Sequence, residues 1–251
     1  MAPGVNKSAS ELGGEQVEGR RAVLELLRAG RRRVRTVYLS GAAGRDDVLE
    51  ELAARAGSAL RTVPPERIDQ LARSEVHQGV VAMAAPLRAS DVDDLLSVEN
   101  AFIVAVDGVT DPRNLGAILR SAETAGATGV VLPRHRSAHL TPVVAKTAAG
   151  AIEYLPMALV GGIPAAINRA SRARCWSVGL DERGERSLFA LDLADQPIML
   201  VLGSEGKGLA RLTRERCDVL VRIPMHGHLA SMNVSAAAAL ACHEVARRRH
   251  Q

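Results

Sequence analysis

Aromatic residues are scarce in this chain, at 2% of its 251 residues. Domains of the RRM and OB types stack bases on aromatic side chains, so extensive nucleic-acid recognition of that kind is disfavoured. Long apolar runs are also missing, because none approaches the roughly 18–20 residues that a membrane-spanning helix needs. The first ten residues lack the apolar stretch of a secretory signal. We therefore expect a cytoplasmic protein without membrane contact.

Cysteine is rare as well. Cys175, Cys217 and Cys242 are the only three and form no Cys-x-x-Cys pair, which argues against a disulfide framework and against a zinc site. His226 and His228 form a His-x-His pair, but no acid or cysteine stands beside them at ligand spacing. The sequence therefore predicts reduced, mostly buried thiols and no bound metal.

Lysine is nearly absent from the basic residues, since only three of the 32 are lysines and the others are arginines. Arginine suits phosphate because its planar fork donates two hydrogen bonds at once and sheds water readily. A GC-rich coding bias also produces chains rich in Ala and Arg, and it explains most of this ratio. The formal net charge of +4 still favours a nucleic-acid partner mildly.

Two apolar runs late in the chain predict short buried strands, Pro197-Ile-Met-Leu-Val-Leu202 and Val219-Leu-Val-Arg-Ile223. The first is followed by Gly203-Ser-Glu-Gly-Lys-Gly208, whose three glycines let a ligand approach the backbone. The second is followed by a loop that places Ser231 and Asn233 near the start of an Ala-rich helix. Because ligands bind at the carboxyl ends of strands in open α/β sheets, the two loops predict a small-molecule site.

The strings Leu202-Gly-Ser-Glu-Gly-Lys-Gly-Leu209 and Ile223-Pro-Met…Ser231-Met-Asn-Val-Ser235 resemble the second and third motifs of the SpoU/TrmH family of RNA 2′-O-methyltransferases. The first motif of that family is matched upstream by Val106-Asp-Gly-Val-Thr-Asp-Pro-Arg-Asn-Leu-Gly-Ala-Ile-Leu-Arg-Ser-Ala-Glu-Thr-Ala-Gly126. Three motifs in the family's order make the resemblance specific. It implies a trefoil-knotted α/β domain of the SPOUT class that binds S-adenosylmethionine and forms a homodimer. Since knots are rare in proteins, the knot is implied by the resemblance alone.

The resemblance also implies which residues hold the cofactor. The family binds S-adenosylmethionine largely through backbone groups of the second and third motifs. The matching positions in this sequence are Leu202, Gly203, Gly206, Ile223, Met225, Leu229, Ser231 and Met232. The alternative for Leu202, Ile223 and Leu229 is that they are simply core residues at strand ends.

Asn114 and Arg120 lie in the helix that the first motif predicts. Arg120 matches the arginine that the family uses at the target ribose and its phosphate. Because an arginine side chain stays protonated in proteins, it suits positioning or activation of the hydroxyl better than general-base catalysis. An ion pair with a nearby acid (Asp107, Asp111 or Glu123) is the alternative for Arg120, and capping of the helix is the alternative for Asn114.

Glu205, Ser231 and Asn233 complete the catalytic set that the resemblance implies. Glu205 is the only acid of its loop and is expected to organise Arg120 or Asn114, with a solvated carboxylate as the alternative. Asn233 is expected to hold the active loop together. Capping of the last helix competes as an explanation for Ser231.

Residues 16–86 alternate helix and strand, which predicts a small α/β domain between a disordered arm (1–15) and a linker (87–99) that leads to the large domain (100–251). Glu18-Gly-Arg-Arg-Ala-Val23 and Val76-His-Gln-Gly-Val80 resemble the L30e-like substrate-binding domain of the RlmB branch of the family. We expect arginines to contact RNA from this domain and from the first motif, with a solvated surface as the alternative: Arg20, Arg31, Arg32, Arg33 and Arg113. The segment Asp181-Glu-Arg-Gly-Glu-Arg186 predicts a charged, solvent-exposed turn.

These features predict an α/β protein that methylates a ribose 2′-hydroxyl of RNA with S-adenosylmethionine, with a guanosine of 23S rRNA as the expected target. The alternatives are a tRNA ribose methyltransferase, an antibiotic-resistance rRNA methyltransferase of the same family, and a catalytically silent RNA-binding or ribosome-assembly factor. A nucleotide-dependent oxidoreductase is disfavoured because no Gly-x-Gly-x-x-Gly follows a first strand.

Overall fold

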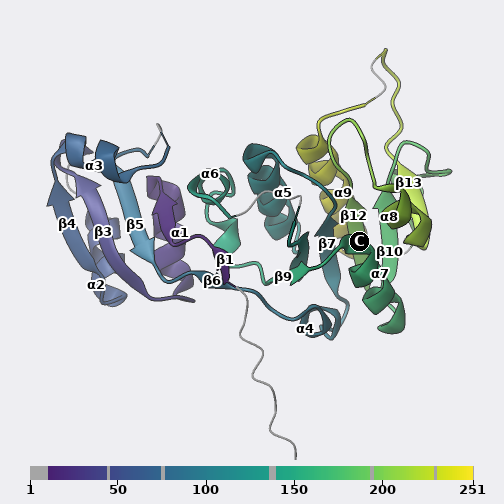
Figure 1. The fold of residues 1–251 in the computed structure, drawn as a ribbon, viewed down its shortest axis with the longest axis horizontal. Coiled ribbons are helices and arrows are strands. Elements are labelled where there is room, and N and C mark those ends of the chain that lie inside the picture. The colour runs from purple at the N-terminus through teal and green to yellow at the C-terminus, as the bar shows by residue number, and fades with distance from the viewer. Residues whose placement is uncertain are drawn as a thin grey trace, which may run out of the picture.

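The computed structural model of the chain describes residues 11–43, 46–74, 77–135, 140–192, 195–228 and 231–250. A small lobe, formed by the N-terminal part of the chain, lies beside a larger one that contains the rest (Figure 1). Within the described residues, no helix has both the length and the apolar character needed to cross a membrane.

The small lobe consists of β2 (Gln16–Glu18), α1 (Arg20–Ala29), β3 (Val34–Ser40), η1 (Gly41–Ala43), α2 (Asp47–Arg55), β4 (Ala59–Val63), α3 (Pro65–Leu71) and β5 (Val80–Ala84). Its four strands lie in the order β2-β5-β3-β4, and only β3 and β4 run parallel. A core that includes Val23, Leu26, Val37 and Leu49 packs α1 and α2 against this sheet. The α/β character predicted for this region is confirmed.

The large lobe consists of α4 (Val92–Leu96), β7 (Phe102–Val106), α5 (Pro112–Thr124), β8 (Gly129–Pro133), α6 (Pro142–Thr147), η2 (Ala151–Glu153), β9 (Met157–Val160), α7 (Ile163–Arg172), β10 (Trp176–Leu180), β11 (Arg186–Ser187), η3 (Leu188–Ala190), β12 (Ile198–Leu202), α8 (Arg211–Arg216), β13 (Val219–Arg222) and α9 (Val234–Arg249). Its seven strands are all parallel, in the order β11-β13-β10-β12-β7-β8-β9. Carboxyl ends of parallel strands share one edge, so the loops that follow them gather there.

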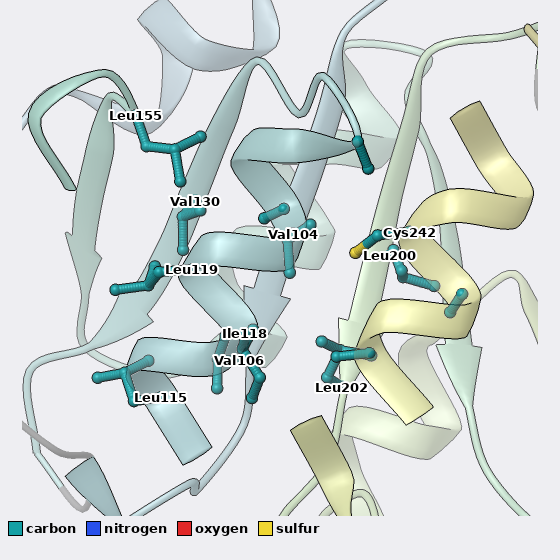
Figure 2. Close-up of a cluster of buried hydrophobic side chains, with 14 of the residues drawn as sticks. Val104, Val106, Leu115, Ile118, Leu119, Val130, Leu155, Leu200, Leu202 and Cys242 are labelled. Atoms are coloured by element: carbon teal, nitrogen blue, oxygen red, sulfur yellow. The ribbon is translucent and has the colours of Figure 1, made fainter. Parts of the chain in front are cut away.

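Helices cover both faces of the large sheet. Val104 and Val106 of β7 pack with α5 and α9, as Figure 2 shows, whereas Ile103 and Ala105 belong to the core on the other face, with α4 and α7. Burial on both faces explains why the central strands are continuous apolar runs rather than alternating ones. A fully buried side chain such as Leu119 contributes about 1.5–3 kcal/mol through the hydrophobic effect.

The position of α5 is fixed at its start and along its length. Asp111 caps the helix by accepting the backbone N–H of Arg113 at 2.8 Å, and Pro112 suits the first turn because it lacks an N–H. A Cβ at Gly116 would lie 2.6 Å from Cβ of Thr147, so only glycine lets α5 and α6 approach this closely. These features hold the N-terminal turn of α5 at the carboxyl edge of the sheet.

A buried ion pair joins the two lobes. Nη2 of Arg32 lies 2.6 Å from Oε1 of Glu153, and the side chains are only 5% and 1% exposed. Nη1 of Arg32 donates to the carbonyl oxygens of Gly14 and Ala85 at 2.6 and 2.7 Å. The guanidinium is therefore surrounded by acceptors, which offsets the cost of removing its charge from water.

Further contacts surround this pair, and we call the whole set the lobe junction (Glu25, Arg31, Arg32, Gly150, Glu153 and Tyr154). The Tyr154 hydroxyl donates to Oε2 of Glu25 at 2.8 Å, and Nη1 of Arg31 donates to the Tyr154 carbonyl at 2.7 Å. Burial and the neighbouring Glu25 carboxylate raise the pKa of Tyr154 to about 12. A Cβ at Gly150 would lie 2.2 Å from Cβ of Glu25, so the backbones meet closely there.

The arm differs from its prediction, whereas the segment assigned to the linker contains a short helix. Within the predicted disordered arm, β1 (Glu11–Gly13) pairs with β6 (Leu87–Arg88), and Leu12 is buried in the large core. Residues 1–10 lie outside the described part of the chain. The predicted linker contains β6 and α4, whose Val92, Leu95 and Leu96 are buried. These apolar side chains at helical spacing anchor the segment to the large lobe.

The cysteines agree with the prediction of buried thiols for two of the three. Cys175 and Cys242 are buried and Cys217 is half-buried, and all are free. Burial raises the pKa of each thiol to about 12, which leaves the unreactive protonated form at neutral pH.

Candidate active site

Three loops meet at the carboxyl edge of the large sheet. They follow β10, β12 and β13, which are adjacent parallel strands. Together with the start of α9 they enclose a pocket, which we call the loop pocket and which is lined by Leu180, Asp181, Glu182, Arg183, Leu202, Gly203, Ser204, Glu205, Gly206, Lys207, Gly208, Arg214, Ile223, Met225, Ser231, Met232, Val234 and Ala237.

The residues expected to bind the cofactor converge on this pocket. Those that line it are Leu202, Gly203, Gly206, Ile223, Met225, Ser231 and Met232. Leu229 lies outside the described residues. Their contact with a cofactor stays a prediction. The loops after β12 and β13, about twenty residues apart in the chain, line the same pocket because the two strands end at the same edge of the sheet.

Glycines shape the loop that follows β12. The backbone N–H groups of Ser204 and Gly208 each donate to the other's carbonyl at 3.0 Å, which closes a tight turn. A Cβ at Gly203 would lie 2.2 Å from the Gly208 carbonyl carbon, and Gly206 has φ +74°, a value that side chains disfavour. The turn leaves the Glu205 and Lys207 side chains exposed at its tip.

A chain of hydrogen bonds ties the three motifs together. Asn233 Nδ2 donates to Oδ1 of Asn114 at 3.1 Å, and Asn114 Nδ2 donates to Oε2 of Glu205 at 3.1 Å. Asn114 is 8% exposed and does not cap α5, since Asp111 does so. Asn233 also caps α9, because its Oδ1 accepts the backbone N–H of Ser235 at 2.8 Å. Its capping and bridging roles therefore coexist.

Arg120 and Ser231 are not part of this chain. Arg120 is exposed on α5, six residues beyond Asn114 and therefore about 9 Å further along the helix axis. Among the described residues it forms no ion pair, so the proposed partners Asp107, Asp111 and Glu123 do not hold it. Ser231 is exposed and lines the loop pocket. Thus the structure brings Asn114, Glu205 and Asn233 together, and leaves Arg120 outside the pocket.

The loop after β10 forms a third wall of the loop pocket that was not predicted from the sequence. Asp181, Glu182 and Arg183 line the pocket, although this segment was predicted to be a solvent-exposed turn. Asp181 is 6% exposed, and its Oδ2 accepts Nε of Arg214 at 2.8 Å. That prediction is wrong for Asp181, because the ion pair with Arg214 offsets the free-energy cost of burying its carboxylate. Asp181 directly follows β10, and its position at the carboxyl end of this strand places it at the pocket.

The lining suits a ligand that carries an apolar ring and charges of both signs. Leu180, Leu202 and Ile223 supply apolar surface, and the neighbouring glycines expose backbone groups. Acidic and basic side chains both reach the pocket, among them Glu182 and Arg183. S-adenosylmethionine carries an adenine, a sulfonium, an ammonium and a carboxylate, so the residues fit this cofactor.

His226 and His228 are exposed in the loop that follows β13. Among the described residues, no group of three or more His, Cys, Asp or Glu side chains is placed to hold a metal ion.

The arginines expected to bind RNA fall into two groups. Arg32 is withdrawn from solvent in the lobe junction, so the prediction that it contacts RNA is wrong. Arg31 keeps exposed surface while it donates to the Tyr154 carbonyl, and Arg20 pairs with Asp46 but keeps half its side chain exposed. Arg33 and Arg113 are exposed. RNA contact by these four stays a prediction.

Comparisons with known proteins agree with this geometry. The family model for the SpoU rRNA methylase family matches residues 101–243, and the model for RNA 2′-O ribose methyltransferase substrate binding matches residues 16–90. The chain is similar to the 23S rRNA (guanosine-2′-O-)-methyltransferase RlmB of Pseudomonas aeruginosa, with 40% identity over 244 residues that cover 94% of this chain and 97% of that protein.

Two further matches extend the comparison. An uncharacterised tRNA/rRNA methyltransferase of Mycolicibacterium vanbaalenii is 41% identical over 243 residues, which cover 94% of this chain and 77% of that protein. The fold matches the SpoU methyltransferase AviRb of Streptomyces viridochromogenes, solved in complex with the cofactor AdoMet, with a TM-score of 0.81, 27% identity and coverage of 94% and 90% of the two chains.

Proposed function

This chain belongs to the SpoU rRNA methylase family of S-adenosylmethionine-dependent RNA 2′-O-methyltransferases, and we propose that its substrate is a guanosine of 23S rRNA in the cytoplasm. The observation that carries the proposal is the similarity to RlmB of Pseudomonas aeruginosa, which extends over both lobes and not over the large lobe alone. Because the small lobe matches a substrate-binding family, similarity there bears on which RNA is bound.

S-adenosylmethionine supplies a methyl group made electrophilic by its sulfonium. The task of this chain is then to hold the donor and the ribose hydroxyl in line and to shield them from competing water. The loop after β12 serves the first need, because the paired backbone hydrogen bonds of Ser204 and Gly208 fix its turn before the ligand arrives. Pre-organisation of this kind lowers the entropy that binding costs.

Asn114 is the proposed link between the donor and acceptor sides of the site. It bonds to Glu205 in the loop after β12 and to Asn233 at the start of α9. The Glu205 carboxylate is thereby held at the pocket, where it can accept a hydrogen bond from the ribose hydroxyl. Ser231 lines the same pocket and contributes a polar contact.

Arg120 is proposed to position the target ribose and its phosphate. Its exposed guanidinium forms no ion pair among the described residues, so it can bind an anion without first breaking one. Arg120→Ala is expected to abolish methyl transfer while S-adenosylmethionine binding persists. Arg172→Ala, an exposed arginine of α7, is the matched control, and an active Arg120→Ala enzyme would refute the role.

We also propose that the protein is a homodimer through the large lobe. Leu240 on α9 is 42% exposed, and the small alanines around it would permit close packing by a second copy. Sedimentation of the purified protein tests this proposal, because a dimer has twice the chain mass of 26.6 kDa.

Tritiated-methyl transfer to unmodified 23S rRNA, 16S rRNA and bulk tRNA, run in parallel, tests the substrate. Label on 23S rRNA in an alkali-resistant dinucleotide is the expected result, because ribose 2′-O-methylation blocks cleavage at that position. The tRNA alternative is kept because the relative from Mycolicibacterium vanbaalenii is described as a tRNA/rRNA methyltransferase. Label on tRNA alone would favour it, and bound cofactor without any transfer would favour a silent RNA-binding factor.

A further inference from the structure

A second cleft opens beside the loop pocket, at the same edge of the sheet. It is bounded by Asp107 and Gly108 after β7, by Pro133 and His135 near the end of β8, by the turn into α7 and by the segment that runs into α8, and its volume is about 840 Å³. Ser204, Lys207, Gly208 and Arg214 line both hollows, so the loop after β12 and the Arg214 side chain separate them. We call this hollow the α7 cleft.

The α7 cleft contains the N-terminus of a ten-residue helix. α7 begins at Ile163 after Gly161 and Gly162, and no side chain caps it. A Cβ at Gly161 would meet nothing within 4 Å, so the approach to the helix end is open. Pro164 has no N–H and the Ala165 N–H donates to the Gly162 carbonyl at 3.1 Å, so the helix dipole is what favours an anion at this end.

A buried hydroxyl without a partner lies in the same wall. Thr213 lines the cleft and is 0% exposed, and among the described residues its Oγ1 forms no hydrogen bond. A helical threonine normally donates to the carbonyl four residues earlier, which here is that of Leu209. That oxygen instead accepts Nη2 of Arg214 at 3.0 Å. A buried donor left without an acceptor is costly, and a ligand oxygen would satisfy it.

Positive charge surrounds the opening. Lys207 is exposed, and Arg211 has an 85% exposed side chain whose only ion pair among the described residues is with Glu215 at 3.4 Å. Asp107 is the acid that lines the cleft, and one of its oxygens is engaged by the backbone N–H of Ala210 at 3.2 Å. Arg214 also lines the cleft but is paired with Asp181. Within the part of the chain that the structure describes, Lys207 forms no ion pair and Arg211 forms only a long one, which leaves a net positive site.

We propose that the α7 cleft binds a backbone phosphate of the RNA substrate, next to the nucleotide that enters the active site. A phosphate oxygen would accept from the Thr213 hydroxyl, and the helix end and Arg211 would balance its charge. A phosphate could also come from a free nucleotide or inorganic phosphate. RNA is favoured because the loop after β12 is shared with the cofactor pocket, so a strand that reaches one hollow passes the other. The inference rests on the proposed function.

The test compares Thr213→Val and Arg211→Gln with Arg216→Gln. Arg216 belongs to the same helix and is exposed, but it bonds to Asn168 and lines neither hollow. Dissociation constants for 23S rRNA fragments and for S-adenosylmethionine are measured separately on the full chain, together with melting temperatures. Thr213→Ser, which keeps the hydroxyl, controls for packing.

We expect Thr213→Val to weaken RNA binding about tenfold, the effect of losing one hydrogen bond to a charged acceptor, without weakening cofactor binding. Its melting temperature without RNA should be unchanged or higher, because the methyl removes an unpaired buried hydroxyl. Arg211→Gln should weaken RNA binding. It should also reduce the slope of the logarithm of the dissociation constant against the logarithm of the salt concentration by about 0.7–0.9, the value for one phosphate contact. Thr213→Ser and Arg216→Gln should bind RNA like the wild type.

RNA affinities within twofold of the wild type for both Thr213→Val and Arg211→Gln would overturn the inference. A second result would also overturn it: inorganic phosphate raises the melting temperature of the wild type, Thr213→Val abolishes that rise, and RNA affinity is unchanged. The ligand of the cleft would then be a small phosphate and not RNA. Failure of the proposed function has a different signature, because wild-type protein would then transfer no methyl group to RNA whatever the variants do.

Discussion

The loop pocket and the lobe junction use charged residues in opposite ways. At the pocket, backbone turns and a chain of amide side chains fix the geometry, while several charged side chains stay at the surface. At the junction, Arg32 and Glu153 are both withdrawn from water and satisfied by protein groups. The pocket is thus prepared for a ligand, whereas the junction is already complete.

This difference shows why a run of arginines is a weak indicator of RNA binding. Arg31, Arg32 and Arg33 are consecutive, but Arg32 is buried at the junction and Arg33 is exposed. The charge of the two side chains is the same, and what distinguishes Arg32 is the buried acid Glu153 across the interface. The junction therefore sets where the small lobe presents its remaining arginines.

The largest expected effect comes from breaking the junction. Glu153→Ala leaves the Arg32 charge buried without its partner, which should cost about 3–5 kcal/mol of unfolding free energy in urea titrations. Replacing both residues with leucine should restore most of that stability, because no buried charge remains. A Glu153→Ala protein as stable as the wild type would show that the pair contributes nothing and that the lobes are held by other contacts.

The next effect should come from the pocket. Gly203→Ala places a Cβ 2.2 Å from the Gly208 backbone, so the loop must open. Methyl transfer should fall about a hundredfold because the donor is misplaced, and the melting temperature should fall as well because backbone must move to relieve the clash. Gly227→Ala is the matched control, since its Cβ would meet nothing within 4 Å. Full activity in Gly203→Ala would mean that the turn is not needed.

A smaller effect is expected at the link between the motifs. Asn114→Ala removes both side-chain bonds of Asn114 and releases Glu205, so kcat should fall about tenfold while cofactor affinity changes little. Steady-state kinetics with saturating cofactor separates the two quantities. An equal loss in cofactor affinity would assign Asn114 to donor binding instead.

The smallest effect returns to the junction. Tyr154→Phe removes the hydrogen bond to Glu25 and should cost about 1 kcal/mol of stability. Because the pKa of Tyr154 is raised from 10.0 to about 12, its contribution is present below pH 10 and is lost as the pH rises through 12. Urea unfolding between pH 8 and about 12 should therefore show a steeper alkaline loss for wild type than for Tyr154→Phe, and parallel curves would contradict this assignment.

The sequence was sufficient for the parts of the molecule that local patterns determine. The strands β12 and β13 are short apolar runs, so the ranges predicted for them agree with the structure to within one residue at each end. The two loops of the pocket were predictable because each follows such a strand and contains glycines or capping residues.

Features that depend on distant partners were not predictable. Glu11–Gly13 was assigned to a disordered arm but forms β1, because it pairs with β6 far along the chain. Asp181 and Arg32 were both assigned to solvent or RNA, since their partners Arg214 and Glu153 lie far away in the sequence. The trefoil knot and the L30e-like character of the small lobe stay predictions from the family resemblance.

Nucleoside mass spectrometry of 23S rRNA tests the central proposal most directly. Unmodified 23S rRNA would be incubated with the protein and S-adenosylmethionine, digested to nucleosides and compared with a sample treated with the Asn114→Ala variant. The account predicts 2′-O-methylguanosine in the wild-type sample, at a much higher level than in the variant sample. A methylated base, another methylated ribose nucleoside, or no product on 23S rRNA beside product on tRNA would contradict it.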